Sequence, residues 1–248
     1  KEAIDDYDEA LKHHPGDVHV LILRSRALRH EGRDEEANRD YQAALSATNL
    51  TLAGLTTRAR ERRDRGDLRG ALDDLQQAHA MDRGDPYLLS SMAVVLADLD
   101  RISEAIDALD QYVVAKPSET SIINRAVLLA RVGDIDAAIK DLNAAVKPPN
   151  VSKVQYQAAC VHALLMERGR GSRALALLFL SKALLAGYGL DDVSTDADLD
   201  ALRDDEDFKA LLRTVQLSKG ARRGQAGSPS DSESRHRDDP EPSPKTSL

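Results

Sequence analysis

Residues 66–78, Gly-Asp-Leu-Arg-Gly-Ala-Leu-Asp-Asp-Leu-Gln-Gln-Ala, hold the pattern that decides the fold. Ala71, Leu75 and Ala78 follow one another at intervals of four and three residues. One helical turn separates each pair, so the three side chains lie on one face of a helix. Gly66 stands five residues before Ala71 and indicates a turn ahead of this helix.

This pattern recurs along most of the chain. The counterparts of Ala71 are separated by steps of 34, 34, 34, 33 and 38 residues, and the Leu75 and Ala78 positions follow in the same steps. Ala71 has the counterparts Ala3, Ala37, Ala105, Ala138 and Ala176. Leu75 has the counterparts Tyr7, Tyr41, Leu109, Leu142 and Leu180. Ala78 has the counterparts Ala10, Ala44, Tyr112, Ala145 and Ala183. Unrelated helices have no reason to share a spacing, so the period predicts a repeat array.

The repeating unit resembles the tetratricopeptide repeat. In that family an Ala is followed four residues later by a large residue and often, eight residues after that, by Pro; Tyr7 to Pro15 and Leu109 to Pro117 have the second spacing. The small residue expected in the first helix of each unit is present as Ser25, Ala59, Ala93, Ala126 and Ala159, whereas the family's Trp is absent and its first-helix Tyr is replaced by Leu28, Arg62, Leu96 and Leu129. The resemblance covers residues 1–187 and implies an all-α fold, a right-handed α-solenoid of helix-turn-helix repeats.

Three regions follow from this pattern. Residues 1–187 are expected to form the array, in which residues 1–12 are the second helix of a truncated repeat and about five helix pairs follow. The expected pairs are 18–30 with 34–46, 52–65 with 68–81, 87–99 with 103–115, 118–131 with 135–146, and 154–166 with 174–185. Residues 188–217 depart from the period and read as a C-terminal cap of short acidic helices, with Leu199, Leu202, Phe208, Leu211 and Leu212 on one side. From Ser218 to Leu248 the chain has almost no apolar residues, and we expect a disordered tail.

The composition indicates which cellular compartment and which kinds of partner are compatible with this protein. A single cysteine, Cys160, excludes an internal disulfide and suits a reducing compartment. The net charge of −8 disfavours nucleic acid as the main partner, and no stretch is apolar for the roughly 18 to 20 residues that a membrane helix needs. We therefore expect a cytoplasmic protein. Lys1 begins inside a helical pattern, which suggests that a longer chain precedes it.

The sequence contains no catalytic, cofactor-binding or metal-binding motif. No two histidines have the three- or four-residue spacing of helical metal ligands, and Cys160 and His162, two residues apart, point to different faces of a helix. The acidic doublets Asp5-Asp6, Asp73-Asp74 and Asp204-Asp205 are the candidate carboxylates if the chain is a hydrolase or transferase. On the outside of a helix, however, such charged residues usually form a solvent-exposed face, and we interpret them in this way. We expect no enzyme in this chain and no cofactor.

Arginines recur at equivalent positions of the first helices. Arg26 and Arg29 stand 34 residues before Arg60 and Arg63, and in tetratricopeptide arrays such positions line the concave groove that holds a partner peptide. The same columns continue to Val94 and Ala97, to Val127 and Ala130, and to Cys160 and Ala163, so the groove is expected to be basic in its first half and apolar in its second. The predicted partner-binding residues are Arg26, Arg29, Arg60, Arg63, Val94 and Val127. The alternative is that the arginines neutralise Asp and Glu of neighbouring second helices.

The expected function is a non-catalytic protein-interaction module that binds an acidic peptide or protein with an apolar segment. Residues 156–212 also resemble the last repeat and cap of helical arrays that follow bacterial Ser/Thr protein kinase domains, which implies that the chain is the C-terminal region of such a kinase. A free-standing scaffold or co-chaperone-like adaptor is the alternative.

Overall fold

The computed structural model describes residues 2–147 and 151–225, and this part of the chain contains helices and no strand. The helices of the repeats begin and end within two residues of the expected positions. They are α1 (Glu2–His13), α2 (Val18–His30), α3 (Asp34–Ser46), α4 (Leu52–Asp64), α5 (Leu68–Met81), α6 (Pro86–Asp98), α7 (Ile102–Ala115), α8 (Glu119–Val132), α9 (Ile135–Ala145), α10 (Ser152–Met166) and α11 (Arg173–Leu185).

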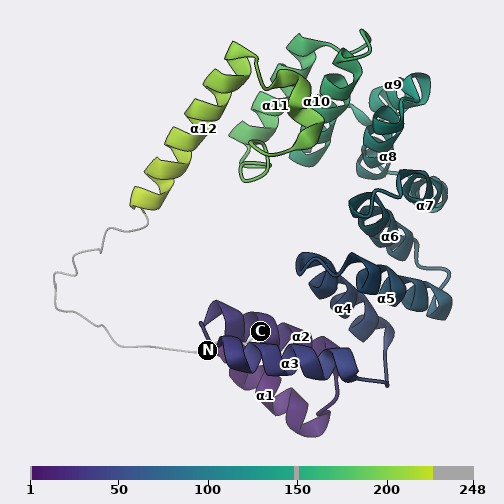
Figure 1. Ribbon diagram of the computed structural model, residues 1–248, viewed down its shortest axis with the longest axis vertical. Coiled ribbons are helices and arrows are strands. Elements are labelled where there is room, and N and C mark those ends of the chain that lie inside the picture. Colours follow the sequence, from purple (N-terminus) through teal and green to yellow (C-terminus); the bar gives the residue numbers. More distant parts are fainter. Residues whose placement is uncertain (1, 148–150, 226–248) are drawn as a thin grey trace, which may run out of the picture.

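The helices form consecutive antiparallel pairs that follow one another along an arc (Figure 1). α2 packs against α3, α4 against α5, α6 against α7, α8 against α9 and α10 against α11. In the middle of the arc, α4, α6 and α8 lie on its inner side and α5, α7 and α9 on its outer side. The all-α solenoid of helix pairs expected from the period is thus confirmed.

Small side chains set the contact within each pair. The repeated alanines of α3, α5, α7, α9 and α11, Ala71 among them, are at most 1% exposed, and the small residues of the first helices are buried against them. Ala3 of α1 is exposed. Ser25, the one polar member of the first-helix column, donates its hydroxyl to the carbonyl oxygen of Ala37 at 2.7 Å. Because Ala lets helix backbones approach closely, a chain with few aromatic residues still fills its core.

The turn inside each pair needs a left-handed backbone residue. Gly32, Gly66 and Gly133 have φ between 73° and 83°, a region that glycine enters without steric cost. Asp100 occupies the same position in the α6–α7 turn with φ of 59°. In the α10–α11 turn, Gly169 has φ of 67°. The α6–α7 turn therefore carries backbone strain that the turns of the other four pairs do not.

A cap closes the array after α11. It consists of the 3₁₀ helix η1 (Ala197–Leu202), which packs on α10, and of α12 (Glu206–Gln225), which packs on α11. Leu199, Leu202 and Phe208 are at most 1% exposed, as the role of a cap requires. Gly189, at the start of this segment, has φ of 74° and lies so close to the Tyr156 ring that a Cβ would overlap it.

The expected start of the tail needs correction. Residues 218–225 belong to α12 and do not begin a disordered segment. Ala, Arg, Lys and Gln in this stretch favour helix, and the first proline after α12 begins is Pro229. The remainder of the expected tail, 226–248, lies outside the described residues. None of the described helices has the length and apolar content needed to cross a bilayer.

Candidate functional site

Two adjoining hollows form a groove along the first helices. The smaller, about 160 Å³, lies between α4 and α6, and the larger, about 500 Å³, extends from α4 and α6 to α8 and α10. Arg63 and Val94 line both hollows and so connect them. We call this surface the first-helix groove; its principal side chains are Arg60, Arg63, Val94, Val127, Arg131, Lys153 and Tyr188.

The charged side chains that line the groove are predominantly cationic. Arg60 is exposed and has no ion pair among the described residues, and Lys153 likewise has none. Arg63 donates from Nε to Asp98 at 2.5 Å, with both side chains more than a third exposed. Exposed pairs of this kind contribute little stability, so a ligand carboxylate can replace Asp98 at small cost. The groove is therefore suited to an anionic group near Arg60 and Arg63.

Arg26 and Arg29 are placed differently from Arg60 and Arg63. Both donate to Glu61 of α4, Arg26 through Nε at 2.6 Å and Arg29 through Nη2 at 2.7 Å, and Arg65 donates to the same carboxylate at 2.7 Å. Glu61 is 1% exposed. The carboxylate that these arginines neutralise thus lies on the next first helix, and not on a second helix as the alternative interpretation supposed.

The expectation of an apolar second half is wrong for most of the column. Val94 is 38% exposed, but Val127 is only 4% exposed, and Ala130, Cys160 and Ala163 are completely buried. The reason is the close approach of α8 to α10 and the packing of η1 on α10. Val127 forms part of the groove floor, and Val94 is the exposed apolar residue of the predicted column.

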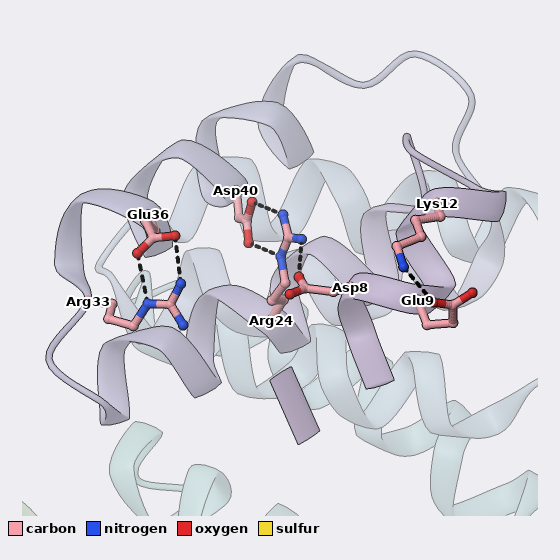
Figure 2. Close-up of polar contacts among 7 residues, drawn as sticks. All are labelled: Asp8, Glu9, Lys12, Arg24, Arg33, Glu36 and Asp40. Carbon is pink, nitrogen blue, oxygen red and sulfur yellow. Dashed lines mark hydrogen bonds and ion pairs between the residues drawn. The ribbon is translucent and has the colours of Figure 1, made fainter. Parts of the chain in front are cut away.

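A second set of arginines, which the sequence did not single out as a column, joins neighbouring repeats. Arg24 binds Asp40 of its own pair through Nε and Nη2, both at 2.7 Å, and Asp8 of the preceding helix through Nη1 at 2.6 Å (Figure 2). The same arrangement returns with Arg125, which binds Asp141 and Asp110. The signal in the sequence is an Arg followed 16 residues later by Asp, repeated at the period of the array.

Arg58 is the buried member of this set. It binds Asp74 with Nε at 2.9 Å and Nη2 at 2.7 Å, and it donates to the carbonyl oxygen of Ala44 at 3.0 Å. Asp74 belongs to one of the acidic doublets, and Asp205, of another doublet, is bound by Arg173. That contact lowers the pKa of Asp205 below its usual range. Both carboxylates are thus held in ion pairs with arginine.

Beneath the cap lies a buried polar cluster at the end of the groove. Arg131 donates to both carboxylate oxygens of Asp198 at 2.8 and 2.7 Å, and Tyr156 donates its hydroxyl to Asp196 at 2.9 Å. Cys160 lies beside both aspartates, and one atom of each of the three side chains falls within 4.8 Å of the others. Burial, followed by the charges of Asp196 and Asp198, raises the pKa of the thiol well above its usual value. A protonated thiol and two carboxylates held by protein donors are a poor set of metal ligands.

Arg131, Lys153 and Tyr188 line the groove but were not expected there. Arg131 occupies the position in its repeat that Asp64 and Asp98 occupy in the two preceding repeats. The change from a negative to a positive side chain at this repeat position is the signal in the sequence that could have identified Arg131. Tyr188 belongs to the cap and has no equivalent in the repeats.

Two parts of the chain, residues 1–49 and 62–126, match family models described as tetratricopeptide repeat. No curated protein sequence matches the chain. Solved structures of similar fold include a tetratricopeptide repeat protein from Parabacteroides merdae (18% identity, 86% of this chain and 91% of that chain, TM-score 0.56). Another is YrrB, described as a tetratricopeptide repeat protein with an unusual peptide-binding site (19% identity, 72% and 90%, TM-score 0.50).

The Cut9–Hcn1 hetero-tetramer of the APC/C is also similar, at 19% identity and a TM-score of 0.55. The match covers 86% of this chain but only 39% of that one. At such identities the likeness concerns the fold. Residues 1–49 and 62–126 thus match tetratricopeptide repeat models, and the solenoid of helix pairs resembles the fold of these structures.

Proposed function

We propose that the protein is an interaction module that binds an extended, acidic segment of a partner protein in the first-helix groove. The observation that carries the proposal is the position of Arg60, an exposed cation with no partner of its own among the described residues, beside Arg63 and Val94 in one connected groove. Arginine binds carboxylates through paired hydrogen bonds. Val94 offers an apolar contact next to that charge.

The groove contains more positive than negative side chains along its length. Arg60, Arg63, Arg131 and Lys153 line it, and Asp98 is the one carboxylate among the lining residues of the described chain. Arg131 is paired with Asp198 and Arg63 with Asp98, so the excess of positive charge comes from Arg60 and Lys153. Such an excess attracts acidic ligands even though the whole chain carries a net charge of −8. Arg26 and Arg29, already bound to Glu61, are assigned to holding α2 against α4 and contribute to binding only if that carboxylate is released.

Selection of peptides provides the test. A random peptide library selected on the full chain should yield sequences with an Asp or Glu next to an apolar residue. Arg60→Glu, Arg63→Glu should reduce the affinity of those peptides at least tenfold, because the substitution reverses two charges at the binding position. Arg69→Glu, Arg83→Glu changes the charge equally at exposed positions outside the groove and serves as the matched control. Peptides without an acidic residue, or equal binding by the two double variants, would refute the proposal.

We further propose that this module is the C-terminal region of a bacterial Ser/Thr protein kinase and acts in the cytoplasm, where it would hold a substrate for the kinase. The proposal rests on the resemblance of residues 156–212 to the last repeat and cap that follow such kinases. The intact mass of the natural protein, captured with an antibody to residues 2–217, decides it. A mass far above 27.1 kDa together with kinase activity supports the proposal. A mass near that value favours the alternative, a free-standing scaffold or co-chaperone-like adaptor.

A further inference from the structure

Helix α11 presents a stripe of leucines on its outer face. Leu175, Leu178 and Leu185 are 40%, 45% and 78% exposed, and Lys182 lies between the last two. These four residues follow the spacing of three, four and three, which keeps them on one face of the helix. The opposite face, with Ala176, Leu180, Ala183 and Leu184, is buried in the array. α11 is thus apolar on both sides.

The other repeats provide an internal comparison for this stripe. Each earlier second helix has residues at the same four positions, counted from its repeated alanine. They are Glu2, Asp5, Glu9 and Lys12 in α1, Glu36, Arg39, Ala43 and Ser46 in α3, Gly70, Asp73, Gln77 and Ala80 in α5, Glu104, Asp107, Gln111 and Val114 in α7, and Ala137, Lys140, Ala144 and Lys147 at the α9 position. Figure 2 shows two of the α1 residues, Lys12 and Glu9, paired at the surface.

The comparison shows which residue types occupy these four positions when the helix face is exposed to solvent. Nearly all of the equivalent residues are charged, polar or small, and Val114 is the single large apolar one. In α11 three of the four are leucine. A solenoid has no packing need for apolar side chains on this outer face, so the leucines indicate a surface that another molecule covers.

A second copy of the chain is a poor occupant of this stripe. In a parallel pair of α11 helices Lys182 would face its own equivalent, which places two like charges together. In an antiparallel pair Lys182 would face Leu178, which buries an unpaired charge against an apolar side chain. The charge of Lys182 thus disfavours self-association through α11.

We propose that the α11 stripe docks an amphipathic helix of a partner protein, with apolar residues facing the three leucines and a Glu or Asp facing Lys182. Lys182 has no ion pair among the described residues. A single charged residue inside a leucine stripe selects a partner helix of opposite charge and fixes its register. The surface is distinct from the first-helix groove, because it lies on a second helix and shares no residue with the groove.

A designed peptide tests this directly. The probe is a fluorescein-labelled amphipathic helical peptide with leucines at its a and d positions and one glutamate at the a position meant to face Lys182. Fluorescence anisotropy with the full chain should give saturable binding. Leu178→Asp should weaken it at least tenfold, whereas Lys140→Asp, at the equivalent exposed position of α9, should leave it unchanged.

A charge-exchange experiment distinguishes specific docking from non-specific hydrophobic binding. The Lys182→Glu variant should bind the glutamate peptide more weakly than the wild type does. A peptide with lysine in place of that glutamate should bind the Lys182→Glu variant as tightly as the glutamate peptide binds the wild type. Arg60→Glu, Arg63→Glu should bind the peptide like the wild type, so the outcome is independent of the groove. Absence of saturable binding, insensitivity to Leu178→Asp, or failure of the charge exchange would overturn the proposal. So would a dimer in sedimentation velocity that Leu178→Asp dissociates. Circular dichroism of each variant confirms that it is folded.

Discussion

The guanidinium of Arg58 binds the carboxylate of Asp74 through two parallel hydrogen bonds inside the array, where the two side chains are 5% and 0% exposed. A third hydrogen bond, to the Ala44 carbonyl, ties the pair to α3 of the preceding repeat. Arg24 and Arg125 make the corresponding pairs closer to the surface. In the α6–α7 repeat the two positions are instead Met92 and Ala108. The protein thus contains both an ionic and an apolar solution to one packing position.

This comparison predicts strong coupling between Arg58 and Asp74. Arg58→Met should lower stability by roughly 3 to 5 kcal/mol, because it leaves a buried carboxylate with only Arg62, at 3.2 Å, beside it. The double variant Arg58→Met, Asp74→Ala, which copies the α6–α7 repeat, should lose less than Arg58→Met alone. Urea denaturation followed by circular dichroism measures both. Additive effects of the two substitutions would contradict the prediction.

Asp100 should be replaceable by glycine with a gain in stability. Its φ of 59° is in the left-handed region, where the turns of the other four helix pairs have glycine. Asp100→Gly removes the clash of the Cβ with the backbone, and the gain should be about 0.5 to 1 kcal/mol after the greater chain entropy of glycine is subtracted. The control is Gly16→Ala, at a turn where glycine does not have positive φ. A lower thermal midpoint for Asp100→Gly would show that the Asp side chain contributes more than the strain costs.

Cys160 should report movement of the cap. The thiol is fully buried and its pKa is raised, so the folded protein should react slowly with a disulfide reagent at pH 8. Asp198→Asn weakens the bond from Arg131 that holds η1 against α8, and the reaction rate should rise about tenfold. Asp200→Asn, at an exposed position of the same segment, should leave the rate unchanged. Equal rates for all three proteins would mean that η1 does not control access to the thiol.

His162 should make the last repeat sensitive to acid. Burial lowers its pKa, its Nδ1 has no hydrogen-bond partner in the described chain, and its ring stacks on Phe179 at 6.0 Å. Below about pH 6.5, the usual value for histidine, the unfolded chain binds a proton more readily than the folded one, so stability falls as pH decreases.

Replacing the histidine isolates this effect from other titrating groups. His162→Leu should lose less stability than the wild type between pH 7.5 and 5.5, as measured by urea midpoints. His14→Leu, at an exposed position, should follow the wild type. If the His162→Leu and wild-type midpoints change in parallel, His162 does not cause the acid sensitivity.

The sequence by itself determined the array. Ala71, Leu75 and Ala78 define one helical face, and their return every 34 residues determines the number and bounds of the helix pairs, because contacts inside a repeat depend on residues close together in the chain. The 16-residue spacing from Arg58 to Asp74 is equally local. Even the leucine stripe of α11 can be recognised by comparing columns, once exposure identifies the outer face.

Only the tertiary structure decided which arginines are available to a partner. Arg26 and Arg60 are equivalent in sequence, yet Arg26 is bound by Glu61, 35 residues away on the next first helix, and Arg60 has no such partner among the described residues. Arg131 meets Asp198 across 67 residues, and the same cap buries Cys160. These contacts depend on the angle between successive helix pairs and on the path of the cap. Both are set by packing between repeats, which the period of a single repeat does not specify.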